Sequence, residues 1–322
     1  MSTDGLAPYV DFGGVTTAPA PFNLQDALVY AFFLEADADK LQAMCDKVFN
    51  TPSGGAVLYH PLSHHVMLTF GTVKVTSTVP PWDNIGYVTE LHAALWIMTV
   101  RVKKEGDFLI AQQIRLFIPA IFVDNPISLA GGREIHGFAK NWGWATLPDP
   151  STLDSFTLDA FGGNFGPNTS ADRTRLLALD RVNATEPLHL EPLRDIAHAA
   201  SLVTDLVLPN SGSGIVLPGW HFIESLVREA WSPEMPQVFL RQFRSAENGL
   251  LASQQQIVEA SIKMNEEAFH LIDHRYNFTL QQIDSHPFAT ELGIQDQEVP
   301  FGIRITGQLM QEDGVVVWQA GS

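Results

Sequence analysis

The segment Gly131–Ala145 (GGREIHGFAKNWGWA) contains Lys140, the residue of this sequence whose setting is best suited to chemistry. Large and small residues alternate in the second half of the segment, and in an extended strand the two sets face opposite sides of a sheet. Lys140 then shares its face with the aromatic side chains of Phe138, Trp142 and Trp144. The pattern predicts a lysine amine held in an apolar environment.

An ammonium group that is buried among aromatic rings loses hydration, and this loss lowers the pKa of the lysine. At the ordinary pKa near 10.4, only about one lysine amine in a few thousand is neutral at pH 7. Lowering the pKa to about 7 costs roughly 4–5 kcal/mol and yields a nucleophile that forms a Schiff base with a ketone or an aldehyde. The alternative is that Lys140 extends along the aromatic surface and places its ammonium in solvent or beside Glu134.

Other groups of reactive residues favour structural interpretations. His60, His64 and His65 have a spacing that could bind a metal, but their flanking residues are typical of strand and turn and supply no carboxylate. Cys45 lies on the apolar stripe of an expected helix, so it is interpreted as a core residue rather than a nucleophile. We therefore expect no metal site, and no motif implies a nucleotide, a flavin or another cofactor.

The charge and composition exclude several classes of protein. The 322 residues include 36 acidic and 19 basic ones, and the net charge of −17 disfavours binding to nucleic acid or to an anionic membrane. No apolar run approaches the roughly 18–20 residues that cross a bilayer. The N-terminal sequence lacks the basic start and apolar stretch of a secretory signal. A single cysteine excludes an internal disulfide, and together these features indicate a cytoplasmic protein.

The elements that would position Lys140 are mostly strands. The short apolar run Ala27–Leu34 suits a buried strand, and residues 56–123 and those after residue 236 are rich in β-branched and aromatic side chains. A helix is expected over Ala36–Phe49, with Asp37 or Asp39 as its cap. We predict a single α+β domain over residues 1–322 with a mainly antiparallel sheet.

A region with the hydrophobic periodicity of helices interrupts these predicted strands. Apolar residues three and four apart predict three helices, at Arg173–Val182, Glu191–Val207 and Trp220–Trp231. We expect them to form a helical insertion at about residues 170–236, which would act as a lid or an interaction surface.

Several segments resemble the acetoacetate decarboxylase family over most of the chain. GREIHGFAKNWG is similar to the family signature, in which a Gly-Arg-Glu stretch is followed by an aromatic residue, Pro, Lys-Lys and Gly. DNPISLAGGRE resembles the segment that leads into this signature, and Thr89-Glu90 in GYVTELHAAL match a short Tyr-Thr-Glu segment. His286 in DSHPFATELG and the closing IRITGQLMQEDGVVVWQ also fit the family pattern.

The resemblance implies an acetoacetate decarboxylase-like fold, an antiparallel β barrel-like sheet with flanking helices that assembles into a homo-oligomer. It also implies that Lys140 is the Schiff-base lysine and Glu90 the active-site carboxylate. His92 is close enough in sequence to Glu90 to transfer protons. The expected substrate-binding residues surround Lys140 in the sequence: Phe138, Trp142, Arg133 and His136.

Three positions depart from the family pattern. Asn141 stands where the family has a second lysine, so a cation beside Lys140 is missing. The family's arginine for the substrate carboxylate has no counterpart in NLQDALVYAFF. Ala139 replaces a proline, which is a milder change. The first two departures put acetoacetate itself in doubt as the substrate.

Three functions are consistent with this sequence. The first is a Schiff-base decarboxylase of a β-keto acid, in which the lysine iminium accepts the electrons as carbon dioxide leaves. The second is a Schiff-base aldolase or dehydratase on a pyruvate-like or larger carbonyl compound, which the missing arginine favours. The third is a non-catalytic, ligand-binding protein. The expected partner is a small keto acid or another carbonyl compound.

Overall fold

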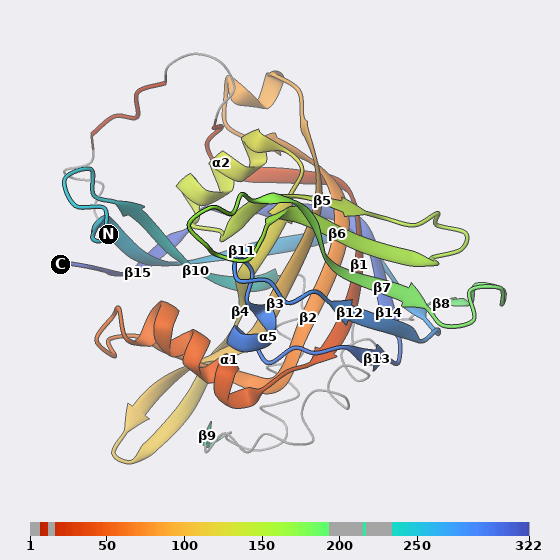
Figure 1. The fold of residues 1–322 in the computed structure, drawn as a ribbon. Coiled ribbons are helices and arrows are strands. Elements are labelled where there is room, and N and C mark those ends of the chain that lie inside the picture. Colours follow the sequence, from red (N-terminus) through yellow and green to blue (C-terminus); the bar gives the residue numbers. More distant parts are fainter. Residues whose placement is uncertain (1–6, 12–16, 193–214, 217–233, 322) are drawn as a thin grey trace.

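The computed structural model describes residues 7–11, 17–192, 215–216 and 234–321 (Figure 1). The strands within these ranges are β1 (Phe22–Glu35), β2 (Leu58–Ser77), β3 (Val88–Glu105), β4 (Phe108–Val123), β5 (Lys140–Thr146), β6 (Ser155–Gly162), β7 (Asp172–Arg181), β8 (Leu190–Pro192), β9 (Ile215–Val216), β10 (Glu234–Arg244), β11 (Ala252–Ile272), β12 (Tyr276–Leu280), β13 (Gln297–Val299), β14 (Gly302–Gln311) and β15 (Val315–Gln319). The helices are α1 (Ala38–Cys45), the π-helix η1 (Asp46–Asn50), the short helix η2 (Trp82–Asn84), α2 (Pro126–Ile135) and α5 (Phe288–Glu291). Among these described helices, none combines the length and the hydrophobicity that a membrane span requires.

The strands form one extended sheet whose neighbours are mostly antiparallel. Its hydrogen-bonded order is β10-β11-β14-β1-β2-β3-β4-β5-β6-β7-β12-β13. Strand β4 also pairs with β10, so that, within the described residues, the seven strands from β10 to β4 form a closed circuit of pairings. Strand β4 runs parallel to β5, β9 and β10, and the sheet is therefore mixed. The expectation of an α+β fold with a mainly antiparallel sheet is met in part.

Strand β1 lies between the hydrophobic core of the protein and a cavity. Along this strand, Tyr30 and Phe32 face a buried aromatic cluster, whereas Ala31 and Phe33 line a cavity. Phe156 of β6 packs edge-on against Tyr30 and Phe32, with ring centroids 5.0 and 5.1 Å apart. The alternation of side chains along a strand thus assigns one face of β1 to the core and the other to the cavity.

The helix expected over Ala36–Phe49 is present as α1 followed by η1. The side chain of Asp37 caps α1 by accepting hydrogen bonds from the backbone N–H groups of Asp39 and Lys40. Cys45 is buried at the end of α1, and burial raises the pKa of its thiol. Its position is that of a core residue rather than of a reactive thiolate.

The predicted helical insertion is wrong where the structure describes it. Arg173–Val182 coincides with strand β7, which pairs with β6 and β12. Residues 176–179 are all buried, and such a continuous apolar run does not by itself distinguish a strand from a helix. Glu191 and Pro192 belong to β8. The remainder of the predicted helix Glu191–Val207 lies outside the described residues, as does the whole of the predicted helix Trp220–Trp231. The single-domain organisation stays a prediction.

Candidate active site

Lys140 is the first residue of β5, and its amine is buried. Its Nζ lies 2.7 Å from Oε2 of Glu90 and 2.6 Å from Oγ of Ser128. Ser128 in turn donates a hydrogen bond to the same carboxylate. Side chains from β3, α2 and β5 thus form one polar cluster, and the carboxylate beside the amine is Glu90 rather than Glu134.

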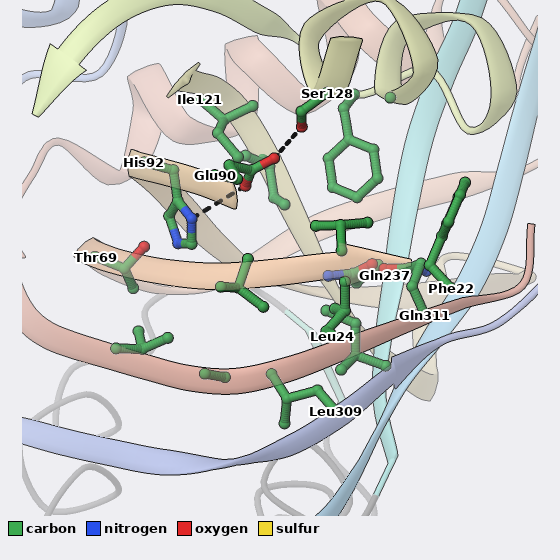
Figure 2. Close-up of a pocket in the computed structure, with 18 of the residues that line it drawn as sticks. Phe22, Leu24, Thr69, Glu90, His92, Ile121, Ser128, Gln237, Leu309 and Gln311 are labelled. Atoms are coloured by element: carbon green, nitrogen blue, oxygen red, sulfur yellow. Dashed lines mark hydrogen bonds and ion pairs between the residues drawn. The ribbon is translucent and has the colours of Figure 1, made fainter. Parts of the chain in front are cut away.

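Glu90 is the anionic centre of this cluster (Figure 2). The residue is 6% exposed, and Nδ1 of His92 lies 3.1 Å from its Oε1. Burial by itself would raise the pKa of Glu90, but the charge of Lys140 and the contact with His92 outweigh it and hold the pKa well below its ordinary range. Glu90 is therefore ionised at neutral pH.

The N-terminal cap of α2 brings Ser128 to the cluster. The side chain of Asn125 accepts hydrogen bonds from the backbone N–H groups of Ile127 and Ser128. Its Nδ2 also donates to the carbonyl oxygen of Thr89 at 3.2 Å, one residue before Glu90. The cap therefore joins the start of α2 to the part of β3 that carries the carboxylate.

The turn between α2 and β5 sets the position of Lys140. Gly137 has a φ of +93°, and a Cβ there would lie 2.6 Å from Cα of Arg241. A Cβ on Gly132 would lie 2.7 Å from Cε of Lys140, so this glycine leaves the space that the lysine side chain occupies. Arg133 donates a hydrogen bond from Nη1 to the carbonyl oxygen of Lys140 at 3.0 Å. These residues position both the backbone and the side chain of the lysine.

The polar cluster is part of the lining of a cavity of about 420 Å³. The wall is mostly apolar and comes largely from the strands of the closed circuit, and Figure 2 shows Leu24 and Leu309 on it together with Glu90 and Ser128. Among the described residues that line the cavity, Lys140 is the only lysine or arginine. The site therefore presents one amine and one carboxylate to an apolar space.

Two of the four predicted substrate-binding residues line this cavity. The ring centroid of Phe138 lies 5.5 Å from Nζ of Lys140. His136 is buried, with Nε2 2.9 Å from the carbonyl oxygen of Glu312, and burial lowers the pKa of His136. Both side chains are in position to contact a bound molecule.

Trp142 and Arg133 do not line the cavity. Trp142 is 48% exposed, and its ring lies 5.9 Å from that of Trp144. Strand β5 begins only at Lys140, so Phe138 precedes the strand and does not continue its alternation. The expected row of three aromatic side chains beside the amine is therefore not formed, and Phe138 is the member of that row that lies beside it.

Two further residues from the family resemblance lie away from the cavity lining. His286 packs against Phe122, with ring centroids 5.3 Å apart, and its Nδ1 lies 3.0 Å from Oγ of Ser285. Asn141 donates from Nδ2 to the carbonyl oxygen of Ala139 at 3.2 Å. The amide that replaces the family's second lysine therefore binds the neighbouring backbone.

The three histidines with metal-like spacing all lie on β2. Within the ranges that the structure describes, no three His, Cys, Asp or Glu side chains are grouped so as to hold a metal ion.

Ser128 and Gln237 are cavity residues that the sequence analysis did not single out. The Asn125-Pro126 pair, which is typical of a helix start, is the signal that could have placed Ser128 in a first helical turn. Gln237 is one of several polar residues of β10, and no local pattern distinguishes it from the others.

The chemistry open to this cluster is proton exchange around a buried amine. The carboxylate and the hydroxyl are both within hydrogen-bonding distance of Nζ, so a proton can pass between Lys140, Ser128 and Glu90. An amine that can give up its proton beside an apolar cavity is suited to nucleophilic attack on a carbonyl group.

Comparisons with solved structures show the fold. The sequence matches no protein-family model and no curated protein. An acetoacetate decarboxylase from Legionella pneumophila matches with a TM-score of 0.57 at 13% identity, over 99% of this chain and 94% of that one. The enduracididine biosynthesis enzyme MppR, complexed with the condensation product of pyruvate and imidazole 4-carboxaldehyde, matches with a TM-score of 0.57 at 11% identity, over 97% and 98% of the two chains. An acetoacetate decarboxylase-like enzyme from Sphingomonas wittichii RW1 matches with a TM-score of 0.52 at 14% identity, over 98% of each chain. The chain thus has the acetoacetate decarboxylase-like fold.

Proposed function

We propose that this protein is a Schiff-base-forming lyase that decarboxylates a β-keto acid through Lys140. The observation that carries the proposal is the position of the Lys140 amine, which is buried at the wall of an apolar cavity and within hydrogen-bonding distance of Glu90 and Ser128. The shared fold with acetoacetate decarboxylase supports the same chemistry.

The first step is formation of the iminium. Lys140 gives a proton to Glu90, either directly or through the Ser128 hydroxyl, and the freed lone pair forms a bond to the carbonyl carbon of the substrate. After a proton moves from the nitrogen to the former carbonyl oxygen, Glu90 returns its own proton to the carbinolamine hydroxyl, which leaves as water, and a protonated imine remains on Nζ. Glu90 then serves as the counter-charge of this cation.

The second step breaks the bond between the α-carbon and the carboxylate. Its electron pair forms the double bond of an enamine, the π electrons of the imine move to nitrogen, and carbon dioxide leaves. A cation and an anion are converted into two neutral products, so an apolar cavity favours the step. Protonation of the enamine carbon and hydrolysis by water release the ketone and regenerate the amine.

The second candidate is aldol addition and dehydration, in which the enamine attacks an aldehyde instead of a proton. One observation favours it for carbonyl compounds that lack a carboxylate: apart from Lys140, no lysine or arginine is found among the described lining residues that could hold a free substrate carboxylate. The fold shared with MppR, whose complex holds a pyruvate condensation product, also supports this alternative.

Borohydride trapping tests the proposal. The protein is incubated with acetoacetate, with a longer β-keto acid and with pyruvate plus an aromatic aldehyde, and the reduced adduct is located by peptide mass spectrometry. We expect an adduct on Lys140 that disappears in Lys140→Ala and persists in the matched control Lys103→Ala, which changes an exposed lysine. Release of carbon dioxide identifies decarboxylation, and an aldehyde-derived product identifies aldol chemistry. Absence of any adduct on Lys140 would reject both and leave the ligand-binding interpretation.

A further inference from the structure

Gln237 of β10 is a polar side chain that the proposed chemistry does not use. It is 0% exposed and lines the same cavity as Lys140. Neither Oε1 nor Nε2 of its carboxamide has a hydrogen-bond partner in the described part of the chain. Figure 2 shows Gln237 among the side chains that line the cavity. An amide buried in this way lacks the hydrogen bonds that nearly all buried polar groups make.

The sheet register places Gln237 at a distance from the reacting amine. Gln237 pairs with Leu116 of β4, and Lys140 pairs with Ile121 on the same strand. These two positions on β4 are five residues apart, which corresponds to about 16 Å along a strand. The amine and the unpartnered amide therefore mark two separate parts of one cavity.

The wall between these two register positions is apolar. Ile118 and Ile121 of β4 line the cavity there, and Trp96 contributes from β3, between the residues that pair with Ala120 and Phe117. A molecule that reaches from Lys140 to Gln237 must pass along these side chains. Its body is therefore apolar, because a polar body would lose its hydration there without gaining partners.

The charge of the site limits what the far end of that molecule can carry. Besides Lys140, the described lining residues include histidines but no further lysine or arginine. Burial holds the pKa of His65 at about 4, so this histidine is neutral at neutral pH. A carboxamide donates and accepts hydrogen bonds without carrying charge, which matches a hydroxyl or an amide better than an ionised acid.

On the basis of the proposed Schiff-base function, we infer that the substrate is a carbonyl compound with an elongated, apolar chain and a neutral hydrogen-bonding group at the end of that chain remote from the reacting carbonyl, and that Gln237 binds this group. A cavity of about 420 Å³ lies in the size range of sites for molecules much larger than a short keto acid. Gln237 is thus a specificity-determining residue, and Lys140 remains the reacting one.

The test compares three carbonyl probes on the full chain: ethyl methyl ketone, methyl octyl ketone and the ω-hydroxy derivative of methyl octyl ketone. Apparent affinities are measured by borohydride trapping on Lys140. We expect the wild type to prefer the long ketones, and the hydroxylated one most. Gln237→Met, which keeps the length of the side chain and removes its polar atoms, should weaken binding of the hydroxylated ketone about tenfold and leave the plain long ketone unchanged.

The matched control is Gln256→Met, which changes a buried glutamine of β11 that is bonded to Arg241 and Gln319 and does not line the cavity. We expect this variant to lose thermal stability while keeping the probe selectivity. Gln237→Met should keep or gain thermal stability, because no hydrogen bond within the protein is lost. Equal effects of Gln237→Met on both long ketones, or no effect on either, would overturn the inference.

A second measurement separates this inference from the proposed function. Decane with hydroxyl groups at both ends has no carbonyl and forms no Schiff base, so its binding is followed by calorimetry. Binding that is weakened by Gln237→Met supports the ligand class even if no carbonyl probe is trapped on Lys140. Trapping of short keto acids alone, without binding of the diol, would overturn the ligand class and leave the Schiff-base function standing.

Discussion

The amine of Lys140 and the carboxylate of Glu90 are 50 residues apart in the sequence, and their nearest atoms lie 2.7 Å apart in the folded protein. Both side chains are buried, so each is the counter-charge of the other in a space where water does not screen them. Glu90 is also the carboxylate nearest to the reacting nitrogen in our proposal. The same contact therefore affects both the stability of the fold and the chemistry of the site.

Glu90→Gln should destabilise the protein most at neutral pH. Removing one partner of a buried ion pair leaves the other uncompensated, and we expect a loss of about 3–5 kcal/mol in the free energy of unfolding at pH 7. Because the folded protein holds the pKa of Glu90 below its ordinary range, the carboxylate stabilises the fold above the unfolded pKa of about 4.3. That contribution is lost as the pH falls through the acid range. Urea unfolding at about pH 7 and pH 3 should show the gap between wild type and variant narrowing at the lower pH, and an equal gap would contradict the assignment.

Ser128→Ala should slow turnover and keep the nucleophile. The hydroxyl lies between the amine and the carboxylate, so its loss removes one path for the proton and leaves the direct contact of Lys140 with Glu90. We expect trapping on Lys140 to persist, a decrease in kcat of about tenfold or more, and a change in stability within about 1 kcal/mol. Steady-state kinetics and single-turnover trapping check the two parts separately. Unchanged kcat would exclude a role for Ser128 in proton transfer.

Gly132→Ala should slow trapping on Lys140, because the added Cβ would lie 2.7 Å from Cε and 3.2 Å from Nζ of the lysine, and the lysine side chain would have to shift away from Glu90 and Ser128. Gly131→Ala is the matched control on the same helix, since a Cβ there meets no atom within 4 Å. Alanine is favoured over glycine in a helix by up to about 1 kcal/mol, so the control should fold at least as well as the wild type. Circular dichroism confirms folding, and peptide mass spectrometry measures the adduct. Full trapping in Gly132→Ala would show that the lysine side chain moves freely.

His65→Gln should flatten the dependence of stability on pH in the mildly acidic range. Burial, with a smaller contribution from the adjacent His64, lowers the pKa of His65 to about 4, whereas an unfolded histidine titrates near 6.5. Between these values the unfolded chain binds more protons, so the wild-type stability falls as the pH drops from about 6.5 to about 4, by about 3 kcal/mol at most. Thermal denaturation across this range measures the slope. An identical slope in the variant would assign the effect to other groups.

Local patterns predicted part of this protein well. Asp37 caps α1 as expected, because a cap depends on the residues next to it. The strand-like composition of residues 56–123 corresponds to β2, β3 and β4. The helix predicted at Arg173–Val182 is strand β7, because a central apolar run that is buried throughout fits either structure and the pairing with β6 and β12 favours the strand.

Residue types and spacing were enough to identify which residues could do chemistry: a lysine within an aromatic and glycine-rich segment, and the carboxylate of Glu90 through the family resemblance. The environment of these side chains depends on the tertiary structure. The register of β4 with β5 and β10 places Lys140 and Gln237 on one cavity, the cap of α2 adds Ser128, and Trp142 of β5 is exposed. The physical reason is range: caps and alternation arise between neighbours along the chain, whereas the environment of a buried group depends on pairings between strands that are distant in sequence.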